Sequence, residues 1–442
     1  RRTGKGAFNI MENLIDYGFK GEIYPVHPIA DEILGGKTFR SVEELPEGTE
    51  LGIIAIPREV VPAIVSSCAR KGIKGLIIVT QGFADADARG RELQAQIDSV
   101  VRETGIRIVG PNTIGIDNPF SDFGAFFIPL MKREKVPTAF ISQTGAFVHP
   151  AYALAPLGKA IDLGNACDVS FAEVLEYLED DEDVRVITLY IEGIKDGKRF
   201  IETAKQVASK KPILALKAGR SARGAEKTAS HSGSLAGQNE VCDAAFKQAG
   251  IIRINDFDEQ QDYVKAFLKL PPLRGGRIGV VTISGAVGVM VTDSLEYHGL
   301  QLAELSRETK ESLQRLSPDW MSIDNPMDVW IASMSHGYKE VMRETVQAVL
   351  SDPNVDGIII YTGCPEPLEG AFFNIAPEIE QLTSKDIGKP IVIVAYAAYG
   401  EALANELEKN PKVATFPTIS RAVRALSFLG RYKEICHTLG TD

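Results

Sequence analysis

The sequence predicts an α/β protein made of three doubly wound domains with parallel sheets. Three observations lead to this fold class: apolar β-branched runs recur along the whole chain, amphipathic stretches separate them, and glycine-rich turns follow several of the runs. Strands buried on both faces are continuously apolar, and a strand–helix–strand order implies right-handed crossovers between parallel strands. At about 150 residues per domain, 442 residues correspond to about three domains.

The expected strands are short, apolar and rich in valine and isoleucine. They span residues 51–57, 75–80, 106–110, 138–142, 184–193, 211–219, 278–284, 355–363 and 389–396. Between them we expect amphipathic helices, for example over residues 200–210 and 240–250.

Two stretches without periodicity indicate the domain boundaries. Residues 118–129 (NPFSDFGAFFIP) and 270–277 (LPPLRGGR) each precede a new strand. We therefore expect domains over residues 1–124, 125–271 and 272–442.

An internal repeat supports this division. Residues 139–158 and 279–299 share the layout of a strand, a Ser/Gly/Ala turn and a helix closing on glycine. Residues 3–21 resemble the second half of the same unit, so the first strand of the first domain is expected before Arg1.

Composition excludes several classes of partner. The net charge of −11 argues against nonspecific binding of nucleic acid or anionic membranes. There is no run of 18 apolar residues, so no membrane span is expected. The five cysteines are odd in number and lack metal-ligand spacing, which predicts reduced thiols, a cytoplasmic location and no metal site.

Three glycine-rich turns are candidate anion sites. They are TGKG (3–6), SQTGA (142–146) and SGAVG (284–288), each placed before a helix. Glycine allows close backbone approach, and a helix N-terminus directs free N–H groups at an anion. The alternative for each turn is a tight connection that only packs a helix on a strand. Residues 79–83 and 108–116 also follow strands, and ligands of open parallel sheets bind at that edge.

His231 lies in KTASHSGSLAG (227–237), among small residues. The other histidines have no ligand spacing to it, and no nucleophile-elbow motif is present, so neither a metal site nor a serine triad is expected. Two readings remain from the residues alone: a solvated loop histidine, or a nucleophile with room for a phosphoryl group.

A set of segments in a fixed order gives the chain a family resemblance. The segments are YPVHP (24–28), GPNTIGI (110–116), ISQTGA (141–146), LGNACDV (163–169), LYIEGIKDGKRF (189–200), ALKAGRSARGAEKTASHSGSLAG (215–237) and DNPMDV (324–329). Together they resemble the nucleoside-diphosphate-forming acyl-CoA synthetases, the superfamily that includes succinyl-CoA synthetase. The resemblance covers nearly the whole chain and follows the domain order of an α subunit of the ADP-forming acetate–CoA ligase type.

The resemblance implies catalytic roles for two residues. His231 would be the transiently phosphorylated nucleophile, and Glu192 would contact its imidazole, fixing the tautomer and raising the nucleophilicity of the free nitrogen. The two helices that hold the phosphate would begin at the second and third glycine turns. Their expected phosphate-binding residues are Ser142, Thr144, Gly145, Ala146, Ser284, Gly285 and Ala286.

The resemblance also implies a Rossmann-like CoA-binding first domain, followed by two flavodoxin-like domains. The expected CoA-binding residues are Gly4, Lys5, Gly6, Pro28, Val79, Thr80, Gln81 and Asn112. The turn at 3–6 would meet the CoA phosphates, residues 79–81 the pantetheine arm, and Asn112 the thioester end.

Some positions depart from the family pattern. His149 and Pro150 stand in the first turn of a phosphate-binding helix, and Gln81 stands where relatives often carry glutamate. These departures bear on acyl preference and rate rather than on reaction class.

The resemblance implies the reaction acyl-CoA + phosphate + ADP ⇌ acid + CoA + ATP, with Mg²⁺ and a small carboxylic acid such as acetate. The chain shows no nucleotide-grasp domain, so we expect a hetero-oligomer with a β subunit, or a fused domain, that binds the ATP or ADP. The alternatives are a CoA-binding regulatory module without turnover, or a relative that couples CoA ligation to another reaction.

Overall fold

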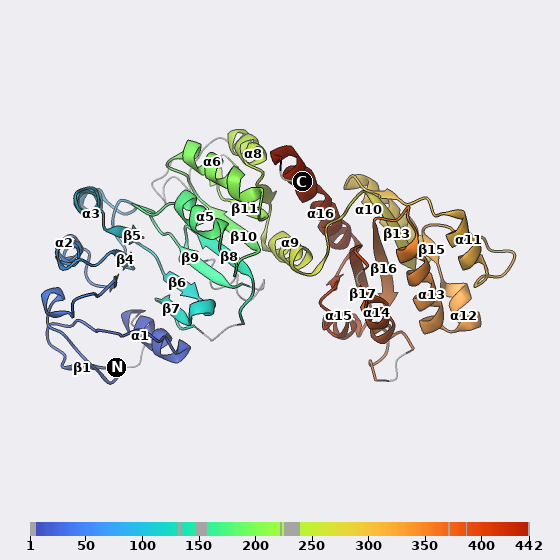
Figure 1. The fold of residues 1–442 in the computed structure, drawn as a ribbon, viewed down its shortest axis with the longest axis horizontal. Helices are drawn as coiled ribbons and strands as arrows, with labels where there is room; N and C mark the ends of the chain where they lie inside the picture. The colour runs from blue at the N-terminus through green and yellow to red at the C-terminus, as the bar shows by residue number, and fades with distance from the viewer. Residues whose placement is uncertain are drawn as a thin grey trace. The chain divides into compact units, whose positions relative to one another are not determined.

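The computed structural model of the protein describes residues 6–130, 134–146, 157–221, 223–224, 239–369, 372–385 and 387–440. The chain divides into two compact units, a first unit that ends at Gln260 and a second unit from Gln261 to Gly440 (Figure 1). Both are α/β, and all nine strands expected from the sequence are present and pair in parallel. In the described parts of the chain, no helix is long and apolar enough to cross a membrane.

The first unit opens with a parallel sheet in the order β3-β4-β5. Its strands are β3 (Leu51–Ile54), β4 (Gly75–Ile78) and β5 (Arg107–Val109); its helices are α1 (Gly6–Tyr17), α2 (Val61–Lys71) and α3 (Ala88–Thr104); and a small hairpin joins β1 (Glu32–Ile33) and β2 (Gly36–Lys37). Local chemistry fixes the helix ends. The Asp87 carboxylate caps α3 by accepting from Gly90 N, and α2 and α3 end on Gly72 and Gly105 with positive φ.

A second sheet of the first unit contains seven described strands in the order β12-β11-β10-β8-β9-β6-β7. The strands are β12 (Ile252–Ile254), β11 (Ile213–Lys217), β10 (Val186–Ile191), β8 (Thr138–Ser142), β9 (Lys159–Asp162), β6 (Gly115–Asn118) and β7 (Phe123–Phe126), and the helices around them include α5 (Phe171–Glu179), α6 (Gly197–Ala208) and α8 (Asn239–Gln248). Strands β12 to β9 are parallel, whereas β6 pairs antiparallel with both β9 and β7. The carboxyl ends of the parallel strands therefore share one edge of this sheet.

The β6–β7 hairpin lies partly in a stretch, 118–129, for which the sequence predicted no periodic element. Asn13 of α1 explains why an extended segment forms there. Its side-chain amide donates to Phe126 O and Ile128 O at 2.9 and 2.8 Å, and its carbonyl accepts from Leu130 N at 2.9 Å. These bonds tie a helix of the first sheet to the edge strand of the second sheet. The expected domain division at residue 124 falls within β7.

The second unit holds a sheet in the order β14-β13-β16-β17-β18, with β15 also paired to β13. Its strands are β13 (Arg277–Thr282), β14 (Gln301–Leu302), β15 (Met327–Asp328), β16 (Gly357–Gly363), β17 (Ile391–Tyr396) and β18 (Val413–Phe416). Its helices are α9 (Phe257–Lys269), which begins at the end of the first unit, α10 (Gly285–Tyr297), α11 (Arg307–Gln314), α12 (Trp330–His336), α13 (Tyr338–Ser351), α14 (Ala376–Thr383), α15 (Gly400–Leu407) and α16 (Ile419–Leu439).

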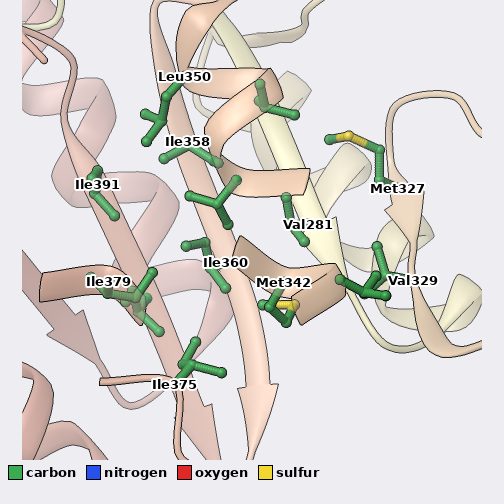
Figure 2. Packing of buried hydrophobic residues seen from close by; sticks show 14 of the residues in the cluster. Val281, Met327, Val329, Met342, Leu350, Ile358, Ile360, Ile375, Ile379 and Ile391 are labelled. Carbon is green, nitrogen blue, oxygen red and sulfur yellow. The ribbon is translucent and has the colours of Figure 1, made fainter. Parts of the chain in front are cut away.

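Alternation along the strands divides the core of the second unit into two layers. Ile358 and Ile360 of β16 pack on one face, toward Met342 and Leu350 of α13 (Figure 2). Ile359, between them in sequence, packs on the other face with residues of α10 and α16. Because strand side chains alternate between faces, a continuous run of isoleucines buries both sides of the sheet. Each fully buried isoleucine contributes about 1.5–3 kcal/mol to stability.

Asn325, in the DNPMDV segment, stabilises the sheet of the second unit through its side chain. Its side-chain amide donates to Ile278 O and Ala303 O at 2.8 and 2.9 Å, and its carbonyl accepts from Val280 N at 2.9 Å. The side chain thus fills positions in the backbone ladder of β13 that a strand would otherwise occupy.

We expect Asn325→Ala to lower the free energy of unfolding by about 2–4 kcal/mol, because it removes three partly buried hydrogen bonds to backbone groups of the sheet. Denaturant unfolding followed by circular dichroism measures the loss. Asn354→Ala is the matched control, since it removes one exposed hydrogen bond to Glu304 O and should cost under about 1 kcal/mol. Equal unfolding midpoints for the two variants would contradict the role assigned to Asn325.

Candidate active site

The carboxyl ends of four adjacent strands gather the polar residues of the candidate site in the first unit. Ser142 ends β8 and pairs with Asp162 at the end of β9. On its other side β8 pairs with β10, which leads directly into Glu192. Lys217 ends β11 and pairs with Ile191. A parallel sheet thus brings together residues that lie up to 75 positions apart in the sequence (217 − 142 = 75).

The turn at residues 142–146, called here the Ser142 turn, is suited to hold an anion. The Ser142 hydroxyl is buried, accepts from Thr144 N at 3.1 Å and donates to Thr144 O at 2.8 Å. A helical turn begins at Gly145, and Ala146 is exposed. A Cβ at Gly145 would lie 2.2 Å from the Ile114 side chain, so only glycine allows this close contact. Backbone N–H groups at such a helix start favour a bound phosphate.

Glu192 is a buried acid at this edge, with 7% of its surface exposed. The Gln143 side chain accepts from Glu192 N and Gly193 N at 2.7 and 2.9 Å and donates to Gly193 O at 2.9 Å. The Lys217 ammonium donates to Glu192 O at 2.9 Å. The backbone of Glu192 is therefore fixed from both neighbouring strands.

Asp162 joins the Ser142 turn to the loop that follows β5. Its carboxylate accepts from Ile114 N at 2.7 Å and from Gly164 N at 3.3 Å. Burial raises the pKa of Asp162 to about 7, against the opposing effect of these hydrogen bonds, and the charge of Glu192 raises it further. Burial, with the charge of Glu192, also raises the pKa of Tyr190 to about 12. Glu192 thus adds to the effect of burial on the pKa of both Asp162 and Tyr190.

The predicted CoA-binding residues after β4 and β5 lie next to this edge. Val79 is buried, Gln81 is exposed, and the Thr80 hydroxyl donates to Ile56 O at 2.8 Å. Asn112 has a left-handed backbone with φ 62, and its amide donates to Asp85 and Asn165 at 3.4 and 3.3 Å.

The loop after β9 packs closely on the Asn112 segment. A Cβ at Gly164 would lie 2.4 Å from Pro111 O and 2.5 Å from Asn112 O, so glycine is needed for this approach. Asn165 N also donates to Pro111 O at 2.9 Å. The GPN and LGN segments, about 50 residues apart in sequence, therefore form one contact between the two sheets of the first unit.

Other predicted site residues are placed as follows. Gly6 begins α1, and Pro28 is exposed beside the β1–β2 hairpin. Ser284, Gly285 and Ala286 lie at the start of α10 in the second unit, where the Asp328 carboxylate is the nearest atom to a Cβ placed at Gly285, at 3.6 Å. Gly4, Lys5, His149, Pro150 and His231 lie outside the described residues.

Sequence reasoning missed three residues of this site. Gln143, Asp162 and Lys217 each lie in or beside a segment that was singled out, but nothing local indicated their contacts. Their partners are 25 to 50 residues away in sequence. In the part of the chain that the structure describes, no group of three or more His, Cys, Asp or Glu side chains could hold a metal ion.

Comparison with known families and proteins shows that the chain is similar to CoA ligases. Residues 1–119 match the CoA binding domain, and residues 135–267 match the succinyl-CoA ligase like flavodoxin domain. The α subunit of acetate–CoA ligase [ADP-forming] II from Pyrococcus furiosus is 37% identical over 418 residues, covering 92% of this chain and 89% of the relative.

Two further similarities extend over nearly the whole chain. Acetate–CoA ligase [ADP-forming] II from Archaeoglobus fulgidus is 34% identical over 98% of this chain, which spans only 64% of that longer relative. The solved structure of a dinucleotide forming acetyl-coenzyme A synthetase 1 from Ca. Korarchaeum cryptofilum, in complex with phosphate and ADP, superposes with a TM-score of 0.87 at 28% identity. That match covers 99% of this chain and 94% of the solved one.

The raised pKa of Asp162 predicts a pH-dependent contribution to stability. Between the ordinary pKa of 3.8 and about 7, the folded state binds more protons than the unfolded state, so the free energy of unfolding falls as pH rises. The fall from this group is at most about 1.4 kcal/mol per pH unit. Asp162→Asn removes the titration, so the stability of wild type relative to this variant should decrease between pH 5 and pH 7.

Denaturant unfolding of both proteins at the two pH values measures this difference. Titrating groups distant from Asp162 are present in both proteins, so their contributions largely cancel. A wild-type advantage that stays constant, or grows, from pH 5 to pH 7 would show that the pKa of Asp162 is not raised.

Proposed function

The chain belongs to the family of ADP-forming acetate–CoA ligases, which form carbon–sulfur bonds, and from this premise we propose how its residues share the reaction. The chain interconverts acyl-CoA, phosphate and ADP with free acid, CoA and ATP, by way of a phosphohistidine. One observation supports the proposal most directly: the backbone at the buried Glu192 is joined by hydrogen bonds to the Ser142 turn, the candidate phosphate site, and that turn contacts the loop of the CoA-binding domain.

In the first step, an oxygen of inorganic phosphate attacks the thioester carbonyl carbon. The carbon–sulfur bond breaks, and the electron pair leaves with the CoA sulfur. The Ser142 turn holds the phosphate through its backbone N–H groups, while residues 79–81 and Asn112 hold the pantetheine arm and the thioester end. The contact between Gly145 and Ile114 brings the two half-sites within reach of each other.

In the second step, an imidazole nitrogen of His231 attacks phosphorus. The bond between phosphorus and the acyl oxygen breaks, and the electron pair leaves with the carboxylate. Glu192 accepts a hydrogen bond from the other ring nitrogen, which fixes the tautomer and stabilises the positive charge that develops on the ring. The role of His231 rests on its sequence segment and on the family.

The nucleotide half of the reaction belongs to a partner. The Pyrococcus furiosus relative is named as an α subunit, and the Archaeoglobus fulgidus relative is longer than this chain. We infer a nucleotide-grasp β subunit, or a fused domain, in a cytoplasmic hetero-oligomer. There ADP takes the phosphoryl group from His231, and Mg²⁺ would supply charge neutralisation at the nucleotide phosphates. The acid is acetate or another small carboxylic acid.

Phosphorylation of His231 is the first prediction of this proposal. Acetyl phosphate alone should phosphorylate the full-length protein, because the second step needs no nucleotide. With acetyl phosphate labelled in its phosphoryl group, the label bound to the protein should be acid-labile and base-stable, as expected for a phosphoramidate bond. His231→Ala should abolish it, whereas Glu192→Gln should slow its formation and leave CoA affinity nearly unchanged. Base-stable label that persists in His231→Ala would assign the nucleophile elsewhere.

The CoA-binding turn gives a second prediction. Lys5→Ala removes a cation that we place beside a CoA phosphate, so CoA affinity should fall by about 1–2 kcal/mol, the usual size of a charge-assisted contact. Isothermal titration calorimetry with CoA measures the loss. Lys20→Ala, an exposed lysine after α1, is the matched control. An unchanged CoA affinity in Lys5→Ala would contradict the placement of the CoA phosphates at this turn.

A further inference from the structure

Gln143 makes contacts that the reaction as described does not use. Its side-chain carbonyl accepts two backbone hydrogen bonds, from Glu192 N at 2.7 Å and Gly193 N at 2.9 Å. Its amide nitrogen donates to Gly193 O at 2.9 Å. One side chain of the Ser142 turn thus makes three hydrogen bonds to the segment that carries Glu192, across 49 or 50 residues of sequence.

The opposite side of Glu192 is fixed by Lys217. This lysine is 6% exposed, and its ammonium donates to Glu192 O at 2.9 Å and to Ala218 O at 2.5 Å. Burial lowers the pKa of Lys217, while the charges of Glu192 and Cys242 oppose that effect. Strands β8 and β11 flank β10 in the sheet, so the backbone of Glu192 is hydrogen-bonded to a residue from each of the two neighbouring strands.

The hydrogen bonds of Lys217 and those of Gln143 connect Glu192 to different parts of the site. The Lys217 ammonium donates to the backbone carbonyls of Glu192 and Ala218, so it joins the ends of β10 and β11. Gln143 is itself a residue of the Ser142 turn, next to Ser142 and Thr144, whose hydrogen bonds shape it. A fixed distance between the turn and Glu192 is what an in-line transfer between phosphate and imidazole requires, because small misplacements of reacting groups are costly.

We propose that Gln143 is a positioning residue that sets the place of Glu192 relative to the phosphate held by the Ser142 turn. The inference rests on the proposed function, since it assumes that Glu192 serves a phosphohistidine. Gln143 touches neither the substrate nor the reacting atoms. It acts by fixing the distance between two parts of the site, the Ser142 turn after β8 and Glu192 after β10.

Gln143→Met tests this role, because methionine has nearly the same length as glutamine but no hydrogen-bond donor and only a weak acceptor. The assay is the rate of phosphoenzyme formation from acetyl phosphate in the full-length protein. The maximal rate should fall by about 10- to 100-fold, the cost of roughly 1 Å of misplacement. The half-saturating concentration of acetyl phosphate should change less than threefold or so, because the backbone N–H groups that bind phosphate remain.

A double-mutant cycle separates positioning from general structural support. If Gln143 acts through Glu192, then adding Gln143→Met to Glu192→Gln should cost less than about twofold more. Losses that multiply would show that Gln143 acts independently of Glu192 and would overturn the proposal. A wild-type rate in Gln143→Met would overturn it as well.

Two controls make these outcomes distinct. Gln206→Met removes an exposed glutamine side chain that donates to the Glu179 carboxylate on a different face of the domain, and it should leave the rate unchanged. If Gln143→Met does not fold, Gln143→Ala, which admits water to the freed backbone groups, takes its place in the same cycle. Failure of the wild-type protein to form any phosphohistidine would overturn the proposed function itself, and with it the role of Gln143.

Discussion

The buried carboxylate of Asp162 is the constraint on which the rest of the site depends. It accepts hydrogen bonds from Ile114 N, in the loop that follows the CoA-binding sheet, and from Gly164 N, in the loop that follows β9. Through Ile114 it also sets the surface against which Gly145 packs. A single group therefore links the CoA-binding sheet, the Ser142 turn and the LGN loop, although burial of the group is itself unfavourable.

This arrangement suits a reaction in which an anion is transferred between groups at one place. In the proposed mechanism, phosphate, thioester and imidazole meet at fixed distances, and the protein contributes mainly position and electrostatic stabilisation. The sheet supplies position, because the ends of parallel strands β8, β10 and β11 lie side by side. In the same mechanism Glu192 supplies a negative charge, and hydrogen bonds from Lys217 and to Gln143 fix the backbone that carries it.

The fold was largely predictable from the sequence, whereas the contacts within the site were not. Runs such as 278–284 and 355–363 can be recognised as strands, because buried parallel strands must be apolar on both faces. The β6–β7 hairpin was missed because Asn13, over 100 residues away, determines it. The Ser142 turn could be found because glycine turns before helices have a local signature. Gln143, Asp162 and Lys217 have none, since their importance comes from partners that only the folded chain brings near.

The central claim is that phosphate attacks the thioester to form an acyl phosphate, which then transfers its phosphoryl group to His231. Single turnover with acetyl-CoA and fully ¹⁸O-labelled inorganic phosphate tests this most directly, with the released acetate analysed by mass spectrometry. The phosphate oxygen that attacks the carbonyl stays with the carboxylate when the bond to phosphorus breaks. The account predicts one ¹⁸O atom in each acetate molecule. Acetate that carries no ¹⁸O would contradict it, because the acid would then have been released without an acyl phosphate cleaved at phosphorus.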